Sequence, residues 1–92
     1  MTDILDLEWK VSDEAVANQV GGETVILHLG NGTYYGLDAI GTTLWEGLKD
    51  GKLPSEVCDQ ILAEYDVQRQ KVEDDLRSFL GKLEEHELVE NS

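Results

Sequence analysis

The sequence predicts an α+β fold in which a three-stranded antiparallel sheet is followed by a three-helix bundle. Apolar residues alternate with other residues in the first third of the chain, and they recur at a helical period in the remainder. Asn31-Gly32 lies between two strand-like runs, which is a strong hairpin signal because both residues tolerate positive φ. This order of elements resembles a winged-helix arrangement.

Extended runs are predicted on both sides of the hairpin. Trp9 and Val11 alternate with polar neighbours, and further runs follow at residues 16–20, 25–29 and 33–37. Within residues 25–29, His28 points to the opposite sheet face from its two leucine neighbours, so we expect an exposed histidine there.

Three helices are predicted from apolar stripes and end signals. Asp38 caps the first, which ends at Asp50-Gly51; Pro54 begins the second; the third runs from about Gln68 to His86. We expect residues 88–89 to fold back on the core and residues 90–92 to be frayed. The stripes consist of Ile40, Leu44, Trp45 and Leu48; Val57, Cys58, Ile61, Leu62 and Tyr65; and Val72, Leu76, Phe79, Leu80 and Leu83.

Length and charge narrow the classes of function. The 92 residues predict a single domain over 1–92, with its core at about 9–89. The net charge of −13, from 20 acidic and 7 basic residues, repels nucleic acid phosphates and anionic membrane surfaces, so we expect neither as a partner. A single cysteine rules out an internal disulfide and agrees with a cytoplasmic location, as does the lack of a signal peptide or a long apolar run.

Residues for catalysis or for holding a metal or cofactor are not evident in the sequence. Cys58 lies on the apolar stripe of a predicted helix, which favours a buried structural thiol over a nucleophile. His86 lies at a helix C-terminus, where capping is favoured. Two distant histidines and a buried cysteine do not make a zinc site, and no EF-hand or phosphate-binding loop is present. The chain is therefore predicted to be a binding module with no cofactor, not an enzyme.

The run at residues 33–37 is the predicted edge strand of the sheet. It has neither the lysine nor the proline that usually blocks such edges, and it contains Tyr34 and Tyr35. An open edge can take up a peptide as an added strand. The alternative is that the two tyrosines only stabilise the sheet, and the pattern alone slightly favours this alternative.

Ordered motifs extend over nearly the whole chain. The run GTYYGLDAIG at residues 32–41, followed by Leu44-Trp45 and Asp50-Gly51, resembles the G-x-Y-x-x-L-N-x-x-G/A…I-W…D-G signature of PqqD-like proteins, which are also called RiPP recognition elements. EYDV at residues 64–67 and VEDDL at residues 72–76 are similar to the second half of that family. The sequence departs from the family where Asp38 replaces the usual Asn, Leu53 a common Thr or Ser, and Glu87 a common Gly.

The resemblance implies a non-catalytic protein that binds the N-terminal leader of a ribosomally made precursor peptide. The leader pairs with the third strand of the sheet, packs against the third helix, and is presented to a leader peptidase and a maturation enzyme (cyclase). Lasso-peptide biosynthesis is favoured over PQQ synthesis by a peptide chaperone of the same fold. A winged-helix protein-interaction module with no leader peptide remains an alternative.

The resemblance also implies a set of peptide-binding residues. Asp75 would pair with a basic or hydroxyl side chain of the leader, and the apolar members would hold its anchor residues. For the leucine and phenylalanine of the third helix, a role in the core competes with one in binding. The strand residues are Thr33, Tyr34, Tyr35, Gly36 and Leu37, and the helix residues are Val72, Asp75, Leu76 and Phe79.

Overall fold

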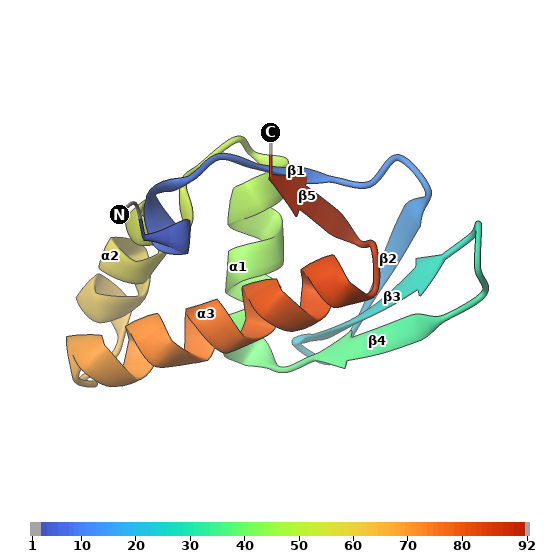
Figure 1. Ribbon diagram of the computed structural model, residues 1–92. Helices are drawn as coiled ribbons and strands as arrows, with labels where there is room; N and C mark the ends of the chain where they lie inside the picture. Colours follow the sequence, from blue (N-terminus) through green and yellow to red (C-terminus); the bar gives the residue numbers. More distant parts are fainter. Residues whose placement is uncertain (1–2, 92) are drawn as a thin grey trace.

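The computed structural model describes residues 3–91 and contains the predicted three-stranded antiparallel sheet (Figure 1). The sheet has the strand order β2-β3-β4, and a separate two-stranded sheet pairs β1 with β5. The strands are β1 Trp9–Val11, β2 Ala15–Val20, β3 Glu23–His28, β4 Tyr34–Leu37 and β5 Val89–Asn91. The α+β, winged-helix-like fold predicted from the sequence is confirmed.

Three helices follow β4 within a residue of their predicted bounds. They are α1 Ala39–Lys49, α2 Pro54–Glu64 and α3 Arg69–Glu85. The predicted cap is present, since Asp38 Oδ1 accepts a hydrogen bond from the backbone N–H of Gly41 at 2.9 Å. The Glu56 carboxylate accepts a hydrogen bond from the backbone N–H of Leu53 at 2.8 Å and so satisfies one amide at the start of α2.

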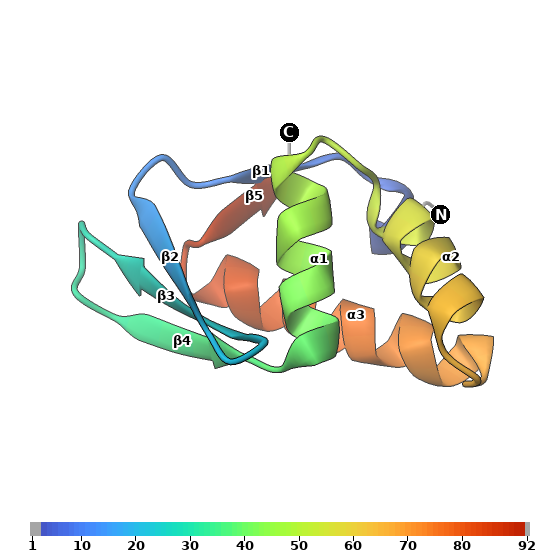
Figure 2. The same cartoon turned by 180° about the vertical axis from the view of Figure 1, so that it is seen from behind.

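The core lies between the three helices and the inner face of the sheet. Figures 1 and 2 show α1 at the centre, with the sheet on one side, α2 on the other, and α3 crossing α1. A short 3-10 helix, η1 Ile4–Asp6, packs against α2 and α3. None of the helices within residues 3–91 has the length and apolar character to span a bilayer. The largest fully buried side chains include those of Trp45, Ile26, Leu37, Leu44, Ile61, Leu76, Leu80, Leu83 and Leu88.

The expectation that the C-terminus is frayed is wrong for residues 90–91. They belong to β5, in which Asn91 pairs with Trp9 and Glu90 pairs with Lys10. The Asn91 side-chain amide also donates to the Glu8 carbonyl at 3.0 Å. Pairing with β1 satisfies backbone groups that a frayed end would leave to water. Ser92, the last residue of the predicted frayed segment, lies outside the described residues.

The predicted exposure of His28 is also wrong. His28 is only 5% exposed, and the sheet buries the face that carries Thr24, Ile26 and His28 while Leu27 faces outward. The imidazole Nδ1 accepts hydrogen bonds from the backbone N–H groups of Gly30 at 3.0 Å and of the next residue at 3.3 Å. The histidine is buried because it satisfies the amides of the β3–β4 turn.

Candidate functional site

The strand β4 is the edge of its sheet, as predicted. It pairs with β3 on one side only, from Leu27↔Tyr34 to Thr24↔Leu37. Its other side presents backbone groups that no strand of the three-stranded sheet takes up. Such a side is a template for an additional strand.

The register of the ladder determines which backbone groups lie on this open side. The His28 amide donates to the Thr33 carbonyl at 2.8 Å, so β3 is hydrogen-bonded to β4 at residue 33 and at every second residue after it. Leu29, one residue along, donates instead toward the β2 side, to Glu14 at 2.9 Å. The N–H and C=O groups of Tyr34 and Gly36 therefore point to the open edge.

The side chains of β4 alternate between the two faces of the sheet. Tyr34 is on the outer face and is 75% exposed, whereas Tyr35 and Leu37 point inward. The Tyr35 ring lies 5.3 Å from the ring of His86, the C-cap residue of α3, at an interplanar angle of 41°. This contact holds β4 against the C-terminal end of α3.

A hollow of about 390 Å³ lies at the C-terminal end of β4, beside Phe79 of α3. A Cβ atom at Gly41 would lie 3.1 Å from Phe79 Cε1 and 3.1 Å from Leu37 Cδ2, so the glycine allows α1, α3 and β4 to approach closely. The hollow is lined by Glu23, Thr24, Val25, Gly36, Leu37, Asp38 and Phe79.

A second hollow, of about 360 Å³, lies toward the N-terminal end of α3. The lining residues 68, 71, 72 and 75, which begin at the N-cap of α3, recur at the spacing of one helix face, and Phe79 of the first hollow continues that face. We call the open edge of β4 and the two hollows the β4–α3 groove. The second hollow is lined by Ile40, Val67, Gln68, Lys71, Val72 and Asp75.

The groove contains most of the residues implied by the family resemblance, but these residues differ in how far they are exposed to it. Val72, Asp75 and Phe79 line the hollows, whereas Leu76 has no exposed surface and packs in the core. The sequence did not indicate Ile40, which comes from α1, or Val67, which comes from the loop before α3. The helical neighbours at 68 and 71 could have been found from the spacing of the α3 face alone.

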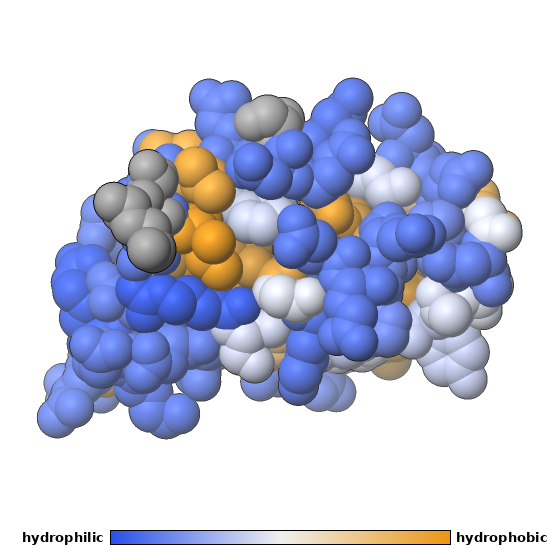
Figure 3. Space-filling view, in the orientation of Figure 1, coloured by the Kyte–Doolittle hydropathy of each residue, from blue (hydrophilic) through white to orange (hydrophobic). Residues whose placement is uncertain are grey.

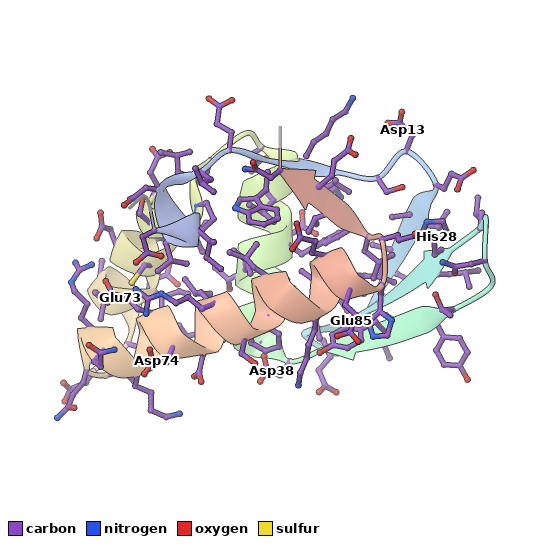
Figure 4. The ribbon with its side chains drawn as sticks, viewed as in Figure 1. Asp13, His28, Asp38, Glu73, Asp74 and Glu85 are labelled. Atoms are coloured by element: carbon purple, nitrogen blue, oxygen red, sulfur yellow. The ribbon has the colours of Figure 1, made fainter. Side chains whose placement is uncertain are left out.

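Carboxylates border the groove. Asp75 is paired with Lys71, whose Nζ lies 3.5 Å from Oδ2, and its side chain is 44% exposed. Figure 4 shows Asp38 between β4 and α1, and Glu85 near the C-terminal end of α3. Both lie on the side of α3 that faces β4. In Figure 3 this face is largely hydrophilic, and the hydrophobic residues that it shows gather above α3, on the side of the helix away from β4. The groove combines apolar side chains such as Phe79 and Val72 with the carboxylates of Glu23, Asp38 and Asp75.

Cys58 and Arg77, which lie outside the groove, have structural roles. Cys58 is buried, and burial raises the pKa of its thiol; the Arg69 guanidinium lies 3.8 Å from Sγ and favours the thiolate less strongly. Arg77 Nε donates to Asp3 Oδ1 at 3.2 Å and ties the N-terminal segment to α3. Within residues 3–91, no cluster of three or more potential ligands could hold a metal ion.

A winged-helix-like module with one open sheet edge beside a helix-lined groove has the architecture of a module that can take up a peptide as an added strand. The family model of the coenzyme PQQ synthesis protein D (PqqD) matches residues 23–89. The chain therefore belongs to the PqqD family of RiPP recognition elements, which are non-catalytic peptide-binding proteins.

Two solved structures are similar to this chain over most of its length. TbiB1, in complex with the TbiA(beta) leader peptide, is 49% identical, with a TM-score of 0.83 over 90% of this chain and 96% of that chain. Lasso peptide synthetase B1, complexed with the leader peptide, is 25% identical, with a TM-score of 0.81 over 90% of this chain and 98% of that chain. No curated protein matches this chain.

Proposed function

We propose that this protein binds the leader segment of a ribosomally synthesised precursor peptide and presents it to a leader peptidase and a cyclase. The open side of β4, with the N–H and C=O groups of Tyr34 and Gly36 beside the α3 hollows, is the observation that carries the proposal. The two similar structures, each bound to a leader peptide, support it. The similarity to lasso peptide synthetase B1 favours a lasso-peptide precursor.

The leader adds to β4 as an antiparallel strand. Tyr34 and Gly36 supply the main-chain hydrogen bonds, and Thr33 and Leu37 flank them. Leader side chains alternate in direction, so every second one enters the space between β4 and α3. Affinity then comes from the backbone pairing and specificity from the side chains that enter the hollows.

The hollows of α3 take the apolar anchor residues of the leader. Phe79 lines the hollow at the end of β4, and Val72 lines the second hollow with Ile40 and Val67. Leu76 supports this face from beneath, because it is completely buried. Burial of each apolar anchor of the leader contributes about 1.5–3 kcal/mol to binding. The entropy cost of ordering the peptide offsets part of this gain.

Asp75 selects a polar feature of the leader. Its half-exposed carboxylate lies at the rim of the second hollow and is shared with Lys71 at 3.5 Å. A basic or hydroxyl side chain of the leader replaces this weak exposed pair with a hydrogen bond in a less hydrated site. The carboxylate thereby fixes the position of the leader along α3.

A PQQ-synthesis peptide chaperone is the second candidate, because the matching family model is that of PqqD. It would use the same groove for a different precursor. A winged-helix interaction module without a leader peptide would instead be indifferent to changes in the backbone of β4. The identity of the peptide that binds therefore separates the three.

Titration of fluorescently labelled leaders of about 20 residues tests the proposal by anisotropy. We expect a Kd of about 1 μM or tighter, equivalent to about −8 kcal/mol. Gly36→Pro removes the edge N–H and should weaken binding about tenfold, whereas the matched Gly36→Ala keeps that N–H and its added methyl meets no atom within 4 Å. Failure of all candidate leaders to bind at tens of micromolar contradicts the proposal.

A further inference from the structure

The hollow at the C-terminal end of β4 opens onto the outer face of the three-stranded sheet. Alternate residues of β3 are buried, and Glu23 and Val25 belong to the set that faces outward. Val25 pairs with Gly36, where a Cβ atom would meet no atom of another strand or helix within 4 Å. The space above this glycine, beside the 41% exposed Val25, is therefore open. We call this part of the hollow the Gly36 notch.

Two carboxylates face each other at one end of the Gly36 notch. The register pairs Thr24 with Leu37, and its continuation by one residue places Glu23 opposite Asp38. Both carboxylates line the hollow, and its lining contains no lysine or arginine. The ion pairs formed within residues 3–91 involve neither of them. Like charges directly opposite each other in a pair of strands repel, so a cation bound between them would remove an unfavourable contact.

Both carboxylates can bind a ligand without loss of the fold around them. Glu23 is exposed, and the hydrogen bond that caps α1 uses only Oδ1 of Asp38, at 2.9 Å from the Gly41 nitrogen. The second carboxylate oxygen of Asp38 can therefore accept from a ligand while the cap stays in place. A calcium ion takes about six to eight oxygen ligands, which is more than two carboxylates supply. A guanidinium or ammonium group, which has several N–H donors, fits two facing carboxylates.

A leader strand added to β4 brings one of its side chains to the Gly36 notch. The N–H and C=O groups of Gly36 point to the open edge, so one leader residue lies directly opposite Gly36. Residues directly opposite each other share a face of the sheet, which places this leader side chain on the outer face. A long basic side chain can cross Gly36 with its alkyl stem against Val25 and its charged end at Glu23 and Asp38.

We infer that the Gly36 notch selects an arginine or lysine at the leader position that pairs with Gly36, an inference that rests on the proposed function. Glu23 and Asp38 then determine specificity at this position. Asp75 in the second hollow already has Lys71 as a partner at 3.5 Å, whereas the lining of the notch supplies no cation. The notch therefore gains more than Asp75 does from a basic side chain of the leader.

Two charge-removing variants test this inference by leader titration. Glu23→Gln/Asp38→Asn, the notch variant, removes both carboxylates, and asparagine retains an oxygen that can cap α1. Because the net charge of −13 by itself attracts a basic peptide, the control removes the same charge elsewhere. Asp13→Asn/Glu90→Gln does so at a hollow beside β1 and β5, and Figure 4 shows Asp13 and Asp38 on opposite sides of α3. The probe is the fluorescently labelled candidate leader that the parent protein binds most tightly.

We expect the notch variant to raise the Kd for this leader about fivefold or more and the control to change it less than about twofold. Higher salt should weaken leader binding by the parent more than leader binding by the notch variant. Equal Kd values for the notch variant and the control would overturn the inference, because net charge alone would then account for the attraction. Absence of leader binding by the parent overturns the proposed function itself.

Substitutions in the leader identify the side chain that the notch binds. Each arginine or lysine of the leader is replaced in turn by methionine, which keeps an unbranched stem and removes the charge. One of these replacements should raise the Kd of the parent about fivefold and leave the Kd of the notch variant unchanged, because both changes remove the same interaction. A leader that binds tightly but has no basic residue coupled in this way overturns the inference and leaves leader binding standing.

Discussion

Glu87 is the only residue other than glycine with a positive φ among residues 3–91, at 59°. It follows the C-cap of α3, where the Leu88 amide donates to the Leu83 carbonyl at 2.9 Å across the end of the helix. Both leucines are buried, so the chain must turn sharply at this point. Glycine is the usual residue at this position of a helix end. We therefore expect Glu87→Gly to stabilise the protein.

The increase in the free energy of unfolding expected for Glu87→Gly is the difference between two opposing contributions. The left-handed conformation costs a residue with a Cβ atom about 1–2 kcal/mol, and glycine removes that cost. Glycine also gives the unfolded chain more conformational freedom, which returns about 0.4–1 kcal/mol. The net increase in the free energy of unfolding is about 1 kcal/mol, which corresponds to a rise in Tm of about 4–8 °C for a domain of this size.

Thermal unfolding followed by circular dichroism measures this change against two controls. Glu87→Gln removes the same negative charge but keeps the Cβ atom, so its Tm isolates the effect of charge. Glu84→Gly makes the same chemical change within the right-handed part of α3 and should lower stability by about 1 kcal/mol. Equal Tm values for Glu87→Gly and Glu87→Gln would refute the conformational reasoning.

Further predictions concern three side chains outside the groove. Because burial raises the pKa of the Cys58 thiol, a thiol reagent should label the native protein much more slowly than the unfolded one, and equal rates would contradict this. His28→Ala should lower the free energy of unfolding by about 1–3 kcal/mol and speed amide exchange at Gly30, whereas His28→Asn, which retains an acceptor, should restore part of the loss. The Arg77 guanidinium holds the pKa of Asp3 below its ordinary 3.8, so this carboxylate stabilises the fold above that pH and the contribution is lost as the pH falls through the lower folded value. Urea unfolding of Asp3→Asn should therefore show a loss near neutral pH that vanishes in acid.

The elements of the fold could be predicted where the signals are local. The helices could be predicted from apolar periodicity and from caps such as Asp38. This cap is a local signal, because its side chain accepts a hydrogen bond from Gly41, three residues along the chain. The alternation around Leu27 and His28 predicted a strand but not which face is buried, because a period of two is symmetrical. Burial of His28 depends on the amides of the following turn, which no hydrophobicity pattern records.

Pairing between distant segments was less accessible from the sequence. The strand β5 is three residues long and exists because it meets β1 at the other end of the chain. Three residues show no usable periodicity, so this pairing could not be anticipated. Tertiary contact, not local preference, makes these residues extended.

The candidate site was located from sequence but not resolved in detail. The open edge at residues 33–37 follows from the order of strands and the lack of blocking residues. The roles of Leu76 and Phe79 could not be separated, since both belong to one helical stripe and only packing decides which is buried. The direction of the Tyr34 amide likewise depends on register, which the hydrogen bond from His28 to Thr33 sets.

Amide hydrogen exchange in β4, measured with and without a bound leader peptide, tests the central claim most directly. The Tyr34 and Gly36 amides point to the open edge and should exchange rapidly in the free protein, then become protected when the leader binds. The Tyr35 and Leu37 amides already bond to β3 and should be protected in both states. Leader binding that leaves the Tyr34 and Gly36 amides unprotected would contradict strand addition at β4.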